Sequence, residues 1–301
     1  MTPAPSAPPS PAPAPAPALI APRTDALREP PRSFKHGSLA ELFHFRQLIG
    51  LLVVRELKVR YKRSVLGLVW TMLNPLLLMV VYTVVFTTIM PTAMPDFSIF
   101  LLSGLLPWLF LSTALLQGMN SVLGNQDLIK KIRLPQAVFP LSVVGSNLVN
   151  FSLSLLPLFL VMLVLGHPLK PALLFLPVAA LVLTVFAAGV TLFFASATVF
   201  FRDVRHLTEV LLQILFYLSP VLYDAGQIDR VASKAWWAPL FRGVLQINPL
   251  TYLLPLVRDP VYRGELPPLE TIGLAALCAA TTLALGYAVF RRLEPRHIHH
   301  F

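Results

Sequence analysis

The chain has 301 residues, of which 56% are hydrophobic, and 24 Lys and Arg against 14 Asp and Glu give it a net charge of +10. In a soluble protein such a charge would suggest nucleic-acid binding, but the apolar composition and the gathering of the cations in a few loops favour a membrane topology, so DNA and RNA are excluded as partners. The single Cys278 excludes an internal disulfide.

Residues 1–22 alternate Pro with Ala and Ser and carry no charge. This composition favours extended polyproline II and offers no apolar surface to bury. We therefore expect residues 1–37 to form a disordered cytoplasmic extension. The segment is not expected to be a signal peptide, because it lacks both a charged start and an unbroken apolar run.

Residues 38–62 combine apolar positions at helical spacing, from Leu42 to Val59, with a dense cluster of cations that ends at Arg63. This pattern predicts an N-terminal amphipathic helix in the cytoplasmic interface, with its apolar side in the acyl boundary and its cations near phosphates. An ordinary juxtamembrane anchor would fit the same composition.

Six uncharged, mostly apolar runs follow this cluster. About 20 apolar residues suffice to cross the hydrocarbon as one helix, and the fifth and shortest run can be extended by Leu207 and Thr208. We predict an all-α integral membrane protein with six transmembrane helices between residues 64 and 290. The runs are Ser64–Pro95, Phe97–Gln126, Leu134–Leu169, Pro171–Phe201, Val210–Tyr223 and Thr271–Phe290.

The orientation follows from the distribution of Lys and Arg, because cationic loops tend to remain in the cytoplasm. With six spans, 18 of the 24 cations fall on the side that holds both termini. Both termini are therefore predicted to be cytoplasmic, including a tail at residues 294–301. We expect His297, His299 and His300 to lie solvated on this tail rather than to bind a metal.

The long outer loop, residues 224–270, contains apolar stretches too short to span and broken by Pro239, Pro249 and Pro255. Short apolar segments that carry Trp and Tyr are typical of re-entrant or interfacial helices. We expect such helices on the outer face before the last span.

The chain lacks two kinds of chemistry. No GxxxxGK[ST] motif is present, so the chain cannot hold a nucleoside triphosphate in a P-loop. The spans contain no Asp, Glu, Lys or Arg, which ion-driven carriers and many membrane enzymes require. A six-span protein of this kind must take its energy from a partner.

From about residue 40 to 293 the chain resembles the type-2 ABC permeases that export O-antigen, teichoic acid and related polysaccharides. No single residue carries this resemblance, which rests on an ordered set along the chain. The set comprises Arg60, Tyr61, Ser64, Leu66, Gly67, Trp70, Pro75, Gly104, Pro107, Trp108, Leu128, Ile129, Lys130, Lys131, Pro135, Phe200–Val204, Ser219, Pro220, Asn248 and Pro249.

The resemblance implies a permease subunit of the bacterial inner membrane, with its transmembrane domain at residues 38–293. It implies a homodimer that works with two copies of an ATPase subunit, which binds the ATP and Mg²⁺, whereas the permease itself has no cofactor, metal or catalytic residue. The implied cargo is a polysaccharide linked to a membrane lipid.

The family docks its ATPases through the N-terminal interfacial helix and the loop between the second and third spans. In this sequence the loop would present an apolar knob rimmed by charge, which suits a groove on a soluble partner. Alternatively, its cations are there only to set the topology. The expected coupling residues are Leu128, Ile129, Lys130, Lys131 and Arg133.

Sugar rings have apolar faces that can slide over aromatic side chains. Tyr82 and Phe86, four residues apart on the first span, resemble the aromatic belt of the polysaccharide exporters. Trp108, Phe110 and Tyr217 are weaker candidates for the same path. The alternative is that these rings only pack within the bundle or against lipid.

Arg55, Arg60 and Arg63 could contact the phosphate of a lipid carrier, although phospholipid headgroups would also explain them. Two rival functions stay open at this point. One is a type-2 ABC permease for drugs or lipids, which would share the fold but not the cargo. The other is a membrane enzyme or assembly scaffold without transport.

Overall fold

Every element that the structure describes is helical. The structure is a computed structural model, and it describes residues 45–62, 67–89, 94–131, 134–224 and 237–297. The predicted extension at residues 1–37 lies outside these ranges. Within them, five helices are long and apolar enough to cross a membrane, which confirms an all-helical, multi-pass membrane protein. These are Trp70–Thr88, Phe97–Met119, Val138–Val164, Pro171–Phe200 and Leu269–His297.

The fifth predicted span corresponds to a shorter helix, α9 (Val204–Leu218). Its 15 residues reach only about 22 Å at the α-helical rise, less than the ~30 Å of hydrocarbon. The helix ends at Leu218, and Ser219 is extended, with φ −103° and ψ 147°, the conformation that a residue before a proline favours. Length and composition alone therefore establish five spans among the described residues, and not six.

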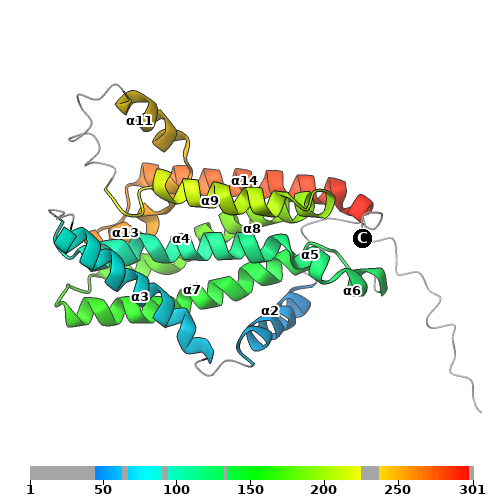
Figure 1. Cartoon of the computed structure of the whole chain (residues 1–301), viewed down its shortest axis with the longest axis horizontal. Coiled ribbons are helices and arrows are strands. Elements are labelled where there is room, and N and C mark those ends of the chain that lie inside the picture. The colour runs from blue at the N-terminus through cyan, green and yellow to red at the C-terminus, as the bar shows by residue number, and fades with distance from the viewer. Residues whose placement is uncertain (1–44, 63–66, 90–93, 132–133, 225–236, 298–301) are drawn as a thin grey trace, which may run out of the picture. The chain divides into compact units, whose positions relative to one another are not determined.

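Helix α4 (Phe97–Met119) is the centre of the bundle, because 78% of its most apolar stretch of 18 residues is buried. Figure 1 shows α7 (Val138–Val164), α8 (Leu176–Phe200) and α9 running alongside it. The last long helix, α14 (Leu269–His297), packs against α8. Helix α3 (Trp70–Val84) crosses this group. It belongs to the candidate span Trp70–Thr88, in which only 6% of the most apolar stretch of 18 residues is buried. Most of the surface of α3 is thus left for lipid or another chain.

Helices α8 and α14 meet backbone to backbone. Gly189 and Gly286 face each other, and a Cβ atom at Gly286 would overlap the carbonyl oxygen of Gly189. Small residues let membrane helices approach closely enough for extensive van der Waals contact. This contact joins the last span to the bundle.

At one end of the bundle, called here the α6 end, three short elements share a hydrophobic cluster with α7, α8 and α14. They are α2 (Arg46–Tyr61), α5 (Ser121–Gly124) and α6 (Gln126–Lys131). The sequence predicts that the apolar side of α2 lies in the acyl boundary, but Leu52 is buried in this cluster inside the protein, and Val59 is 67% exposed. The apolar positions of α2 therefore do not all lie on one packed face.

The opposite end, the α13 end, is built by four short helices between Trp237 and the last span. Arg258 is buried there, and its guanidinium donates hydrogen bonds to the carbonyl oxygens of Pro220 and Val221 and lies 4.0 Å from the ring centre of Phe100. Burial lowers the pKa of Arg258 to about 10, so it remains a cation at neutral pH. The helices are α11 (Ala238–Ile247), α12 (Leu250–Leu253), α13 (Pro255–Arg258) and η5 (Asp259–Arg263).

The side chain of Asn248 links two segments at the α13 end. Its side-chain amide donates to the hydroxyl of Ser219 over 2.9 Å, and its carbonyl oxygen accepts the backbone N–H of Leu250 over 3.0 Å. Ser219–Pro220 and Asn248–Pro249, two of the pairs on which the family resemblance rests, are thus joined directly. This bond sets α12 against the end of α9.

The prediction that His297 is solvated is wrong. Helix α14 continues to His297, whose side chain is fully buried, with Nδ1 2.8 Å from Oε1 of Gln136 and Nε2 2.9 Å from Oγ of Ser196. Glu294 also accepts the backbone N–H of Gln136 over 2.7 Å. The sequence of the last turn looks polar enough for a tail, but these partners satisfy its polar groups inside the protein. The later residues of the predicted tail, 298–301, lie outside the described ranges.

Candidate functional site

An open groove of about 280 Å³ lies between α3, α4 and α9, and it brings together Tyr82, Trp108 and Tyr217. Each helix contributes one of these three rings. We call this hollow the aromatic groove. The sequence placed the three residues in three different spans and could not show that they share one surface.

The rings of the aromatic groove pack on a further ring inside the bundle and are partly exposed to the outside. Trp108 is 7% exposed and packs on Phe216 with 5.4 Å between ring centres, and Phe216 in turn lies 5.3 Å from Tyr217. Tyr217 is 61% exposed. Gln213 and Ser112 line the same groove and add an amide and a hydroxyl to its aromatic surface.

Phe86 and Phe110 lie elsewhere. Phe86 is 6.5 Å from Tyr82, as their spacing predicts, but it leans toward α4, where its ring is 5.4 Å from that of Phe97. Phe110 is buried and lies 5.4 Å from Phe151 of α7. The structure therefore does not bring Phe110 into the groove with Tyr82.

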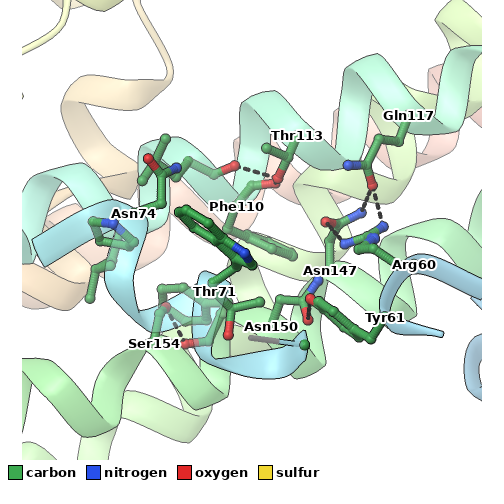
Figure 2. Close-up of a pocket in the computed structure, with 16 residues that line it drawn as sticks. Arg60, Tyr61, Thr71, Asn74, Phe110, Thr113, Gln117, Asn147, Asn150 and Ser154 are labelled. Carbon is green, nitrogen blue, oxygen red and sulfur yellow. Dashed lines mark hydrogen bonds between the residues drawn. The ribbon is translucent and has the colours of Figure 1, made fainter. Parts of the chain in front are cut away.

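A second hollow of about 420 Å³ lies between the end of α2, α3, α4 and α7, and we call it the Arg60 cavity. Figure 2 shows the guanidinium of Arg60 beside the side-chain amides of Gln117 and Asn147 at one side of this cavity. Nη1 of Arg60 donates to Oδ1 of Asn147 over 3.3 Å, and Nη2 donates to Oε1 of Gln117. Next to them, the hydroxyl of Tyr61 donates to Oδ1 of Asn150 over 3.0 Å.

Of the three arginines proposed for lipid phosphate, the two that the structure describes, Arg55 and Arg60, do not share a site. Arg60 faces the cavity, whereas Arg55 donates to Oδ1 of Asn125 over 3.4 Å and so links α2 to the turn between α5 and α6. Arg63 lies outside the described residues. Only Arg60 among the described arginines of this set lies in a hollow that could receive a ligand.

The loop expected to contact an ATPase does form a short helix, α6. Lys130 and Lys131 are exposed on it, but Ile129 is buried and Leu128 packs on the cluster at the α6 end. The apolar knob expected from the sequence is therefore largely used inside the chain. Arg133 lies outside the described residues.

Sequence reasoning missed the amides of Gln117, Asn147, Asn150 and Gln213. The first three lie in helices without charged residues, and Gln213 lies in the uncharged second half of α9. A polar residue at membrane depth is a sign of function by default. A search restricted to charged residues passes over amides, although their hydrogen-bonding groups also need partners in the bilayer.

The fold and these two hollows define a multi-pass membrane protein with an aromatic groove and a cation-lined cavity. Residues 47–262 match the ABC-2 type transporter family. The chain is 38% identical over 250 residues to an O-antigen export system permease protein of Myxococcus xanthus, covering 82% of this chain and 92% of the relative. A protein of the same description from Klebsiella pneumoniae is 30% identical over 265 residues, with 86% and 98% covered.

A polysialic acid transport protein of Escherichia coli is 23% identical over 253 residues, covering 82% of this chain and 93% of the relative. The chain belongs to the ABC-2 type transporter family, as a membrane permease subunit. Such subunits carry no cofactor, and ATP is hydrolysed by a separate ATPase. The resemblance seen in the sequence is thereby confirmed.

Proposed function

We propose that this permease exports a lipid-linked polysaccharide, such as an O-antigen, across the bacterial inner membrane. The observation that carries the proposal is the aromatic groove, where Tyr82, Trp108 and Tyr217 from three helices form one open surface. Aromatic faces support a sliding sugar chain without the tight hydrogen bonding that would hold it in place. The O-antigen export permeases among its relatives support the same cargo.

The working unit is a homodimer with two ATPase subunits. The poorly buried α3 and the exposed apolar residues of α9, including Leu211 and Ile214, support a second copy beside the aromatic groove. A polymer path along the interface between copies would then be lined by aromatic residues from both. The aromatic groove of one chain would form half of this path.

The α6 end faces the cytoplasm, where α2 lies in the interface and the exposed Lys130 and Lys131 contact the ATPase. Helix α9 serves as the fifth of six spans, and α11, α12 and α13 are re-entrant or interfacial helices on the outer side. The excess of cations on the α6 side supports this orientation, because cationic loops remain in the cytoplasm.

Export is tested in a strain that lacks this chain. Wild type should restore the polysaccharide to the cell surface, and a variant with Tyr82→Phe and Tyr217→Phe should restore most of it because both rings remain. Tyr82→Ala with Tyr217→Ala should reduce it strongly. Phe193→Ala is the matched control, because Phe193 is an exposed ring on α8 that does not line the aromatic groove.

Membrane level and ATPase copurification are measured for every variant, so that a loss of export is compared only between assembled transporters. Normal surface polysaccharide with the assembled double Ala variant would remove the groove from the path. That result would favour a drug or lipid permease of the same family.

A further inference from the structure

The Arg60 cavity is distinct from the aromatic groove, since the two hollows share only Leu109 among their described lining residues. A polymer path along the groove therefore leaves the cavity without a role. An arginine and several amides at the edge of a membrane bundle are costly to place unless they serve a ligand or one another.

The cation of the cavity is held in place by amides rather than by a carboxylate. The bonds of Arg60 to Asn147 and Gln117 use two of its five N–H donors, and Asn147, 3% exposed, is itself fixed by a 2.9 Å bond to the carbonyl oxygen of Val143. None of the described residues that line the cavity is Asp or Glu. The charge of Arg60 is thus oriented but not neutralised there.

The rest of the wall is mainly apolar. Phe110, Phe151 and Leu106 line it, and the hydroxyls of Thr113 and Ser154 donate to carbonyl oxygens of their own helices. In Figure 2, Phe110 lies beside the group formed by Arg60, Gln117 and Asn147. A volume of about 420 Å³ is within the range of small-molecule sites. The cavity therefore combines one fixed cation with an apolar wall.

We propose that the Arg60 cavity binds a lipid phosphate, with the phosphate at Arg60 and the hydrocarbon chain beside Phe110 and Phe151. Guanidinium groups bind phosphate through paired, charge-assisted hydrogen bonds, and the remaining donors of Arg60 suit this geometry. The binding of a lipid phosphate does not depend on the proposed function. Only its role in export rests on that function, and there the bound group would be the phosphate that joins the cargo to its lipid carrier.

Binding is measured with dodecyl phosphate, using the permease and ATPase complex in nanodiscs of zwitterionic lipid. Arg60→Gln removes the charge while keeping a hydrogen-bonding side chain, and it should weaken dodecyl phosphate binding by about tenfold or more. Arg55→Gln is the matched control, because Arg55 lies on the same helix but bonds to Asn125 outside the cavity. It should bind as wild type does, and dodecanol should bind weakly to all three proteins.

Competition identifies the source of the phosphate. Displacement by phosphatidylglycerol would assign the site to a bilayer phospholipid, displacement by inorganic phosphate alone to a free anion, and displacement only by single-chain lipid phosphates to a lipid carrier. Equal binding of dodecyl phosphate by wild type and Arg60→Gln, or equal binding of dodecanol and dodecyl phosphate by wild type, would overturn the proposal.

A measurement on the wild type alone guards against a variant that fails to assemble. Dodecyl phosphate with a photoreactive group at its chain end should label the segments of α4 and α7 around Phe110 and Phe151. Labelling confined to lipid-facing positions such as Leu160 and Leu163 would contradict the proposal. If binding is as expected while cells lacking the chain keep their surface polysaccharide, the export function fails and the site stands.

Discussion

Gly104 of α4 lies directly against the guanidinium of Arg258, so that a Cβ atom at Gly104 would overlap Nη2 of Arg258. The same Cβ would stand 3.1 Å from the carbonyl oxygen of Val221, which Arg258 binds. Residues 154 positions apart are therefore matched in size. The absence of a side chain on α4 is what lets a buried cation hold the end of α9.

Gly104→Ala should destabilise the transporter because Arg258 must leave its two carbonyl partners. Overpacking of this kind costs about 1–3 kcal/mol, and unpaired carbonyl oxygens add to it. Thermal unfolding in nanodiscs checks the effect, with Gly50→Ala as control because nothing lies within 4 Å of that position. In an Arg258→Met background the cost of Gly104→Ala should shrink, and additive effects of the two changes would contradict the contact.

Two glycines of α14 should respond in opposite ways to alanine. Gly286→Ala places its Cβ on the backbone of Gly189, which cannot move aside as a flexible side chain can, so α8 and α14 must separate. Gly273→Ala has nothing within 4 Å and should be neutral or slightly stabilising, because alanine favours a helix by about 0.5–1 kcal/mol. Equal melting temperatures for the two variants would disprove the close contact.

The orientation is tested by labelling single cysteines in a Cys278→Ala background with a reagent that does not cross the membrane. Cysteine at Leu266, which is 63% exposed near the α13 end, should be labelled in intact cells. Cysteine at Lys131, exposed on α6, should be labelled only after the cells are opened. The reverse pattern would invert the topology.

Charge reversal on α6 tests the ATPase contact. Lys130→Glu with Lys131→Glu changes two exposed side chains and should leave the bundle folded, while it weakens ATPase copurification and the export that depends on it. Arg291→Glu with Arg292→Glu, two exposed cations near the end of α14, is the control for charge alone. Unchanged copurification of the α6 variant would leave Lys130 and Lys131 with a role in topology only.

The sequence was sufficient for the class of fold, because long uncharged runs leave few alternatives to membrane helices. It was less reliable where a helix is short or polar. The fifth predicted span corresponds to α9, whose 15 residues are too few for its length to establish a span. The polar last turn of α14 hides the burial of His297. Such cases depend on tertiary partners such as Gln136 and Ser196, which no local pattern specifies.

In the candidate site, too, the sequence predicts contacts within one helix but not contacts between helices. The spacing of Tyr82 and Phe86 correctly predicts their proximity, because both lie on one helix. The association of Tyr82 with Trp108 and Tyr217, and of Arg60 with Asn147, joins different helices and depends on how these pack. The sequence could therefore supply candidate residues, but only the packed bundle separates the groove from the cavity.

The most direct test of the account is to ask whether the cargo touches the aromatic groove during export. A photoreactive phenylalanine analogue at position 217 should crosslink to the polysaccharide in exporting cells, and the same analogue at position 193, an exposed ring position on α8, should not. Polysaccharide attached to the chain at 217 alone is the result that the account predicts. Normal export without crosslinking at 217, or equal crosslinking at 217 and 193, would contradict it.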